Sequence, residues 1–317
     1  MRLGFGVEDL HVVERILAIA DPGADTQPAV TRAGALAKKA GAHLDLLICD
    51  YDDHLAGARF GDSDQLRQAR DNLMTSARVK LEEMARPLRD DGVSVDVHTL
   101  FFHPLHEGII SRARELMPDM IVKDTHYHHV LKRTVFSNTD WELIRLCPFN
   151  LLLVKADEWP ADPLLLAAVD PMHLGDKPAT LDKEILAQAK ALSGVVGGTL
   201  QVVHSYPVSM PAAASAAGMV MPATADLEAL RVSIENAHRK ALDRLLENSG
   251  IPAENVLMVP GEPRRQLVDL ARSLKAAVVV TGAVSRGRLK RAFLGFTALH
   301  VLDRLPCDLM IVKLPTA

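Results

Sequence analysis

The 317-residue chain has few aromatic side chains, few cysteines and little net charge. Aromatic residues make up only 4 % of it, against 48 % for all hydrophobic residues, so its cores must be built from Ala, Leu, Val and Ile. That composition is typical of helices packed on a parallel sheet. The three cysteines, Cys49, Cys147 and Cys307, lie in or beside apolar runs without a CxxC pair, which favours structural thiols in a reducing compartment.

Long apolar runs are also missing. No stretch approaches the roughly 18 residues that a membrane span needs, and the first 15 residues are charged and mixed, unlike a secretion signal. A net charge of −4 gives no global attraction to nucleic acid or to an acidic membrane surface. These features predict a cytoplasmic protein that binds neither. No G-x-S-x-G elbow, no HExxH and no nucleophile in a recognisable setting occurs, so nothing favours an enzyme.

What the chain does contain is a long internal repeat. Residues 119–155 reappear as residues 277–313 at an offset of 158, and residues 15–22 match residues 164–171 at an offset of 149. A repeat of this size indicates a duplicated domain, because each copy is far larger than a solenoid unit. We therefore expect two domains, residues 1–157 and 158–317, with the boundary in the acidic, proline-containing stretch 156–163.

Strand and helix patterns alternate in each half. Strands are predicted over residues 15–21, 43–49, 93–101, 119–123 and 149–155, and over 164–170, 199–206, 255–260, 276–282 and 308–313. This alternation implies parallel strands with helices on both faces, so each half is predicted as one doubly wound α/β sheet. The last strands of the halves are apolar and would otherwise be exposed edges. We expect them to meet in an intramolecular pseudo-dimer with a pseudo-two-fold axis.

The carboxyl ends of the strands in the second half carry residues suited to an anion. Doubly wound sheets bind ligands there, at the point where the strand order reverses. Asp170 ends the first strand of this half, and Gly282, Gly287 and Gly295 punctuate the loop that follows the fourth strand. Glycines at such a place allow backbone N–H groups to close around an anion near a helix N-terminus. Arg286 and Arg288 would add positive charge for a phosphate.

The same loop resembles the nucleotide motif of the universal stress proteins, here of the tandem E type, and the likeness runs from about Arg15 to the end. The motif is G-x2-G-x9-G-(S/T), and its four places hold Gly282, Ser285, Gly295 and Phe296, so two agree. Phe296 removes a hydroxyl that would meet a phosphate, although Thr297 follows it. Asp170 matches the family's first-strand aspartate near the adenosine, and "VPGEP" at 259–263 matches its third-strand ending.

The resemblance implies a fold shared with adenylate-handling enzymes, a role in the stress response without catalysis, and an adenine nucleotide, ATP, ADP or AMP, in the second half. Together, the loop composition and the resemblance assign Asp170, Gly282, Ser285, Arg286, Gly287, Gly295 and Thr297 to the nucleotide. Adenosine contacts should outweigh phosphate contacts, and a bulky side chain at Gly282 should block the phosphate path. Hydrolysis of ATP is a distant alternative. The protein partners stay unknown, and a further homodimer stays open.

The first half departs from the motif, with Asp124, Tyr127, Ser137 and Asn138 in its four places. A carboxylate at the first place would repel phosphate, so we expect at most one nucleotide per chain. This half instead carries histidines after its third and fourth strands, and the candidate zinc ligands are His103, His106, His126 and His128. The alternative is histidines with ordinary hydrogen bonds. Trp141 is predicted as a packing residue.

A second class of function stays open. The protein would then bind a metal or an apolar small molecule and would have lost its nucleotide site. The stretch 205–226, predicted as a long loop after the second strand of the second half, contains Met210, Met219 and Met221. Such a loop is either an insertion or an apolar cover over a ligand.

Overall fold

The computed structural model describes residues 13–55, 63–128, 133–135, 137–155, 158–172, 180–206, 227–283 and 304–314. One ten-stranded sheet runs through it in the order β10-β9-β8-β11-β12-β7-β4-β1-β2-β3. The first half contributes β1 (Arg15–Ile19), β2 (His43–Asp50), β3 (Val95–Phe101), β4 (Met120–Asp124) and β7 (Asn150–Val154). The second half contributes β8 (Leu164–Ala168), β9 (Thr199–Tyr206), β10 (Val256–Pro260), β11 (Val278–Gly282) and β12 (Asp308–Val312).

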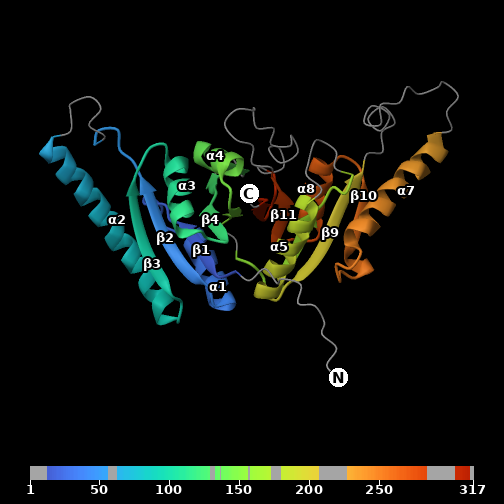
Figure 1. The fold of residues 1–317 in the computed structure, drawn as a ribbon, viewed down its shortest axis with the longest axis horizontal. Helices are drawn as coiled ribbons and strands as arrows, with labels where there is room; N and C mark the ends of the chain where they lie inside the picture. The colour runs from blue at the N-terminus through green and yellow to red at the C-terminus, as the bar shows by residue number, and fades with distance from the viewer. Residues whose placement is uncertain are drawn as a thin grey trace.

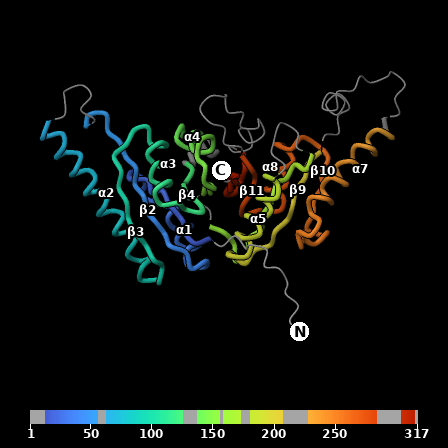
Figure 2. Tube along the Cα trace, viewed as in Figure 1, coloured from blue at the N-terminus to red at the C-terminus, as the bar shows by residue number. Residues whose placement is uncertain are grey.

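Both halves have the same topology. Their internal orders, β7-β4-β1-β2-β3 and β12-β11-β8-β9-β10, are equivalent strand for strand, and every pair within a half is parallel. In Figure 1 the first half, blue to green, lies on one side and the second, yellow to red, on the other. The Cα tube in Figure 2 shows the two as similar units. The predicted pair of doubly wound α/β sheets is confirmed.

Helices cover both faces of the sheet. One face packs against α1 (Pro28–Ala40), α2 (Asp64–Asp90), α5 (Thr180–Val196) and α7 (Leu227–Leu246), and the other against α3 (Leu105–Leu116), α4 (Asn138–Leu146) and α8 (Pro263–Ser273). The strands at the centre of the sheet, such as β7 and β12, are largely apolar because both their faces are buried. The outermost strands, β3 and β10, are only partly buried. Local signals set the helix ends: Pro28 opens α1, Gly41 ends it at φ 68°, and Ser137 forms a capping box at α4.

The two halves join through their last strands, as predicted. β7 and β12 pair antiparallel, with Leu151 opposite Ile311, Leu152 opposite Met310 and Leu153 opposite Leu309. The central pair are equivalent residues of the repeat, because 310 − 152 = 158, the offset found in the sequence. The same offset relates Leu151 to Leu309 and Leu153 to Ile311, so it converts one outer pair into the other. The register therefore places a pseudo-two-fold axis between Leu152 and Met310.

Polar groups repeat this symmetry at the ends of the paired strands. Asn150 and Asp308 are equivalent, since 150 + 158 = 308, and each side-chain Oδ1 accepts a hydrogen bond from a backbone N–H of the other half. The Lys313 N–H donates to Asn150 at 2.9 Å, and the Lys155 N–H donates to Asp308 at 2.8 Å. Asp308 also accepts from Trp159 Nε1 at 2.8 Å. Its position across the join makes Asp308 a buried carboxyl group that contacts both halves.

Three other regions refine the expectations. A short antiparallel hairpin, β5 (His126–His128) and β6 (Arg133–Val135), follows β4 where a loop was expected. β9 continues to Tyr206, so the expected loop at 205–226 begins too early, and residues 207–226 with their methionines lie outside the described part. A 3-10 helix, η1 (Ala253–Asn255), precedes β10. Among the described helices, none has the length and apolar character to span a membrane.

Candidate functional site

The point of reversed strand order in the second half lies between β8 and β11, which are neighbours in the sheet. Asp170 follows β8 and Gly282 ends β11, so the two residues lie at the same carboxyl edge. Asp170 is half-buried, and its backbone N–H donates to Asp182 Oδ1 of α5 at 3.1 Å. The next N–H after β11, that of Ala283, donates to the Val312 carbonyl at 3.0 Å. The main chain on both sides of the candidate site is therefore held in place.

The turn after β10 borders the same edge. Gly261 has φ 137°, a conformation that favours glycine, and an added Cβ would lie 2.5 Å from Gln266 Nε2. The Gly261 N–H donates to the Tyr206 carbonyl at 2.8 Å, and Ser205 Oγ donates to the Gly261 carbonyl at 2.8 Å. Helix α8 begins two residues later at Pro263. The "VPGEP" stretch thus brings a helix N-terminus to the edge that carries Asp170.

Gly282 has a structural reason to be glycine. A Cβ there would lie 2.7 Å from Cγ and Cδ2 of Leu181 and 3.0 Å from Ile185 Cδ1, both buried residues of α5. The side-chain direction leads into the packing between sheet and helix. The expectation that a bulky residue at Gly282 would act by blocking a phosphate path is therefore wrong in its reason, because the first clash is with α5.

The rest of the predicted phosphate loop lies outside the described residues, in 284–303. The members concerned are Ser285, Arg286, Gly287, Gly295 and Thr297. Their assignment to a nucleotide stays a prediction.

A buried histidine pair beside Asp170 was not predicted. His204 of β9 and His238 of α7 are 2 % and 5 % exposed, and His204 Nε2 lies 2.8 Å from His238 Nδ1. His204 Nδ1 lies 3.1 Å from the Val169 carbonyl, which the imidazole N–H can satisfy as donor. Burial lowers the pKa of His238, His204 acts in the same direction, and Asp170 opposes both. The two residues are 34 positions apart, so only the fold reveals the pair.

The first half has a different end to its fourth strand. Asp124 is the equivalent of Gly282, since 124 + 158 = 282, and it is 8 % exposed at the end of β4. Lys123 Nζ lies 3.9 Å from Asp124 Oδ1 and 2.9 Å from Asp140 Oδ1 of α4. The expected carboxylate is present at this edge, and a buried ammonium group accompanies it.

Residues 13–155 and 174–313 each match the model of the Universal stress protein family. The chain belongs to this family. It is 28 % identical over 305 residues to universal stress protein E of Escherichia coli K12, a match that covers 96 % of this chain and 95 % of the relative. The match to universal stress protein E of Photorhabdus laumondii is 24 % identical over 302 residues and covers 95 % of both.

Solved structures agree with this membership. A protein of unknown function from Pseudomonas aeruginosa PAO1 is 26 % identical, with a TM-score of 0.72 and coverage of 95 % of this chain and 92 % of that one. A universal stress protein from Archaeoglobus fulgidus has a TM-score of 0.67 at 16 % identity, covering 94 % of this chain and 98 % of that one, which supports the fold alone. The predicted resemblance to a tandem universal stress protein is confirmed.

The histidines predicted as zinc ligands of this universal stress protein are only partly described. His103 is exposed and stacks on Tyr51, with ring centroids 4.4 Å apart, and His106 lies in the first turn of α3. His126 and His128 lie in β5, and their side chains are outside the described part. Among described side chains, the group with metal-ligand spacing is a different one, His43, Asp45 and Asp96. The zinc site of the two loops stays a prediction.

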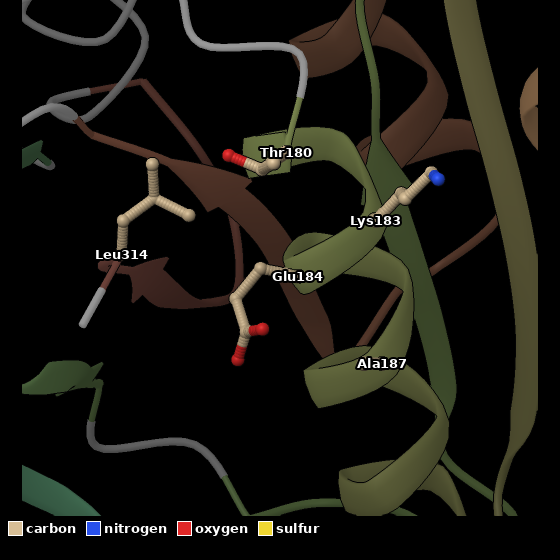
Figure 3. A pocket seen from close by; sticks show the side chains of 5 residues that line it. All are labelled: Thr180, Lys183, Glu184, Ala187 and Leu314. Carbon is tan, nitrogen blue, oxygen red and sulfur yellow. The ribbon is translucent and has the colours of Figure 1, made fainter. Parts of the chain in front are cut away.

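A cavity of about 500 Å³ lies along α5, lined by Thr180, Lys183, Glu184, Ala187 and Leu314. Figure 3 shows Thr180 directed toward Leu314, Glu184 on the same side of α5, and Lys183 pointing away. Its volume falls in the range of small-ligand pockets. The lining contains neither Asp170 nor Gly282, but Leu314 follows β12, whose Val312 pairs with Gly282, so the cavity lies beside the same carboxyl edge.

Proposed function

We propose that the second domain of this universal stress protein, within residues 158–317, binds an adenine nucleotide, and that the protein serves the stress response without catalysis. The observation that supports this most is the position of Asp170 and Gly282 at the ends of adjacent strands, where the order reverses. The turn at Gly261 and the start of α8 border the same edge. A ligand between them would meet a carboxylate, close-lying main chain and a helix N-terminus.

The chemistry of Asp170 suits the nucleoside part. A half-buried carboxylate accepts hydrogen bonds from ribose hydroxyls or from an exocyclic amine, and its partly dry surroundings strengthen such bonds. Its backbone is fixed through Asp182, so the carboxylate needs little ordering on binding. Phosphates would extend toward residues 284–303, where the glycines and Arg286 of the motif occur in the sequence. The loss of the motif hydroxyl at Phe296 makes adenosine contacts the larger share.

The buried histidine beside the proposed site favours binding over hydrolysis. His204 uses both ring nitrogens, one on the Val169 carbonyl and one on His238, and it is buried. An imidazole held in this way is not positioned to activate a water molecule at a phosphate. This arrangement supports a nucleotide sensor or carrier, and ATP hydrolysis remains the distant alternative.

The first domain, within residues 1–157, should not share this function. At the place of Gly282 it has the buried carboxylate of Asp124, and the motif glycines are replaced throughout. Loss of the glycines removes backbone donors from a phosphate. We therefore expect one nucleotide per chain.

We also place the protein in the cytoplasm, because of its cysteines. Cys49, Cys147 and Cys307 are free and buried. Burial raises the pKa of Cys49 and of Cys307 to about 12, which keeps these thiols protonated and unreactive. Unpaired buried thiols are the usual state in a reducing compartment.

Titration calorimetry with ATP and two matched variants tests the proposal. Asp170→Ala removes the carboxylate from the proposed site, and Asp21→Ala removes the equivalent carboxylate after β1. Asp21 is a matched control, because its backbone N–H also donates to a side chain, Gln27 Oε1, at 3.0 Å. A hydrogen bond to a charged group contributes about 1.5–3 kcal/mol, so Asp170→Ala should weaken ATP about 10- to 150-fold. Asp21→Ala should leave the affinity unchanged. Equal effects of the two changes, or no binding to the wild type, would contradict the proposal.

A further inference from the structure

A polar cluster lies at the opposite end of the strands, in the first half. Arg15 of β1, His43 and Asp45 of β2, and Asp96 and His98 of β3 occupy alternate positions near the amino-terminal ends of their strands. Arg15 pairs with His43, and Asp45 pairs with Asp96, in the parallel register. Because paired residues share a face and alternate residues return to it, all five side chains project from one face. This cluster is remote from the carboxyl edge of the second half that carries the proposed nucleotide site.

Three ligand-type atoms of the cluster have the spacing of a metal centre. His43 Nε2 lies 3.3 Å from Asp96 Oδ2 and 3.7 Å from Asp45 Oδ1. In a tetrahedral zinc site with bonds of about 2.0–2.1 Å, neighbouring ligand atoms are about 3.3–3.4 Å apart. His98 Nε2 is 2.7 Å from Asp45 Oδ1, and lengthening that contact by about 0.6 Å would give it the same spacing.

The His43 ring points to what completes the cluster. Its Nδ1 lies 2.9 Å from Ser94 Oγ, whereas its Nε2 is a buried atom without an aligned hydrogen bond among the described residues. Buried ring nitrogens normally have a partner. When Nδ1–H donates to Ser94, Nε2 directs a lone pair at two carboxylates, which is unfavourable unless a cation lies between them. A metal-bound imidazole usually donates its other N–H to an oxygen acceptor that orients the ring, and the Ser94 hydroxyl would take that place for His43.

We propose that His43, Asp45, Asp96 and His98 bind a divalent transition metal, with zinc the best match to two imidazoles and two carboxylates. Asp45 is fully buried, and Arg15 donates to both of its oxygens, from Nε to Oδ2 at 2.7 Å and from Nη2 to Oδ1 at 3.1 Å. A metal at Oδ1 would therefore share this oxygen with Arg15. With neutral imidazoles the two carboxylates and Arg15 sum to one negative charge, which favours a divalent cation. Asp96 is 67 % exposed on its side chain, so the metal has access from solvent.

Zinc titration of chelator-treated full-length protein, with Co²⁺ absorption as a second readout, tests the site. Asp96→Asn changes an exposed residue, so it should fold normally, and His43→Gln removes the central nitrogen. We expect one zinc ion at this site and an affinity at least tenfold lower in each variant, since even outer-contact changes cost about 10- to 100-fold. His103→Gln, a change in the rival loops, should leave this binding intact. Absence of zinc binding, or binding that persists in Asp96→Asn and His43→Gln, would overturn the proposal and leave the cluster an ion-pair network around Asp45.

Discussion

Replacing Asp308 by asparagine should change how the stability of the protein depends on pH. Asp308 lies at the join between the halves, and burial raises its pKa from 3.8 to about 6, although Arg32 and its hydrogen bonds oppose the shift. Arg32 Nε is 3.2 Å from Asp308 Oδ2. A raised pKa means that the folded state prefers the protonated acid. The contribution to stability is therefore full below the unfolded pKa near 3.8 and is lost as pH rises through about 6.

The size of the effect follows from the shift. A difference of about 2.2 pKa units corresponds to about 3 kcal/mol at 1.36 kcal/mol per unit, and about 2 kcal/mol of it falls between pH 4.5 and pH 7.5. The introduced amide cannot ionise, but its Oδ1 can still accept from the Lys155 N–H, as Asn150 accepts from Lys313 at the equivalent position. Asp308→Asn should lose the contact with Trp159 Nε1 and the ion pair with Arg32. Its stability relative to wild type should rise by about 2 kcal/mol between those two pH values.

Urea unfolding of both proteins at pH 4.5 and pH 7.5 measures this difference, because other titrating groups cancel in the comparison. Asn150→Gln, a change at the equivalent position that adds no charge, serves as a control and should show no such pH dependence. A stability difference between Asp308→Asn and wild type that is equal at both pH values would refute the assignment of a buried, raised-pKa carboxylate at the join.

Two further predictions concern packing and a buried cation. In thermal unfolding, Gly282→Ala should destabilise the protein by about 1–3 kcal/mol, because its Cβ would overlap Leu181. Gly194→Ala in α5, with open space around the new Cβ, should stabilise it by up to about 1 kcal/mol. Equal effects of the two changes would contradict this. Lys313 is buried and its Nζ donates to the Ile144 carbonyl. Burial lowers the pKa of Lys313 to about 8, so its contribution to the stability of the folded protein is lost as pH falls through that value. In urea unfolding, the free energy of unfolding of Lys313→Met should therefore rise by about 2 kcal/mol relative to wild type on going from pH 9.5 to pH 7.5. A constant difference would count against it.

Much of the fold could be predicted because its signals are local or repeated. The offset of 158 located equivalent strands, and the apolar character of β7 and β12 identified them as partners. The hairpin of β5 and β6 was missed because its strands have three residues each, too few for a period to show. The predicted strand 199–206 matches β9, and only the start of the predicted loop at 205 overlapped its last two residues.

The candidate sites were harder to predict because they depend on contacts between distant residues. His204 and His238 meet only when α7 packs on β9, and neither position carries a motif. Histidine and aspartate alternate visibly in β2 and in β3, but only the register that pairs Asp45 with Asp96 brings the two sets together. Gly282 was correctly placed at the strand end, yet its close approach to Leu181 requires knowledge of where α5 lies.

Counting the nucleotides bound to each chain tests the central claim most directly. Native mass spectrometry of the full-length protein with excess ATP should show a complex with one nucleotide, because only the second half combines Asp170 with a glycine at the end of its fourth strand. The complex should be lost in Asp170→Ala and kept in Asp21→Ala at an ATP concentration near the wild-type Kd. Two nucleotides per chain, no nucleotide, or one that depends on Asp21 would contradict the account.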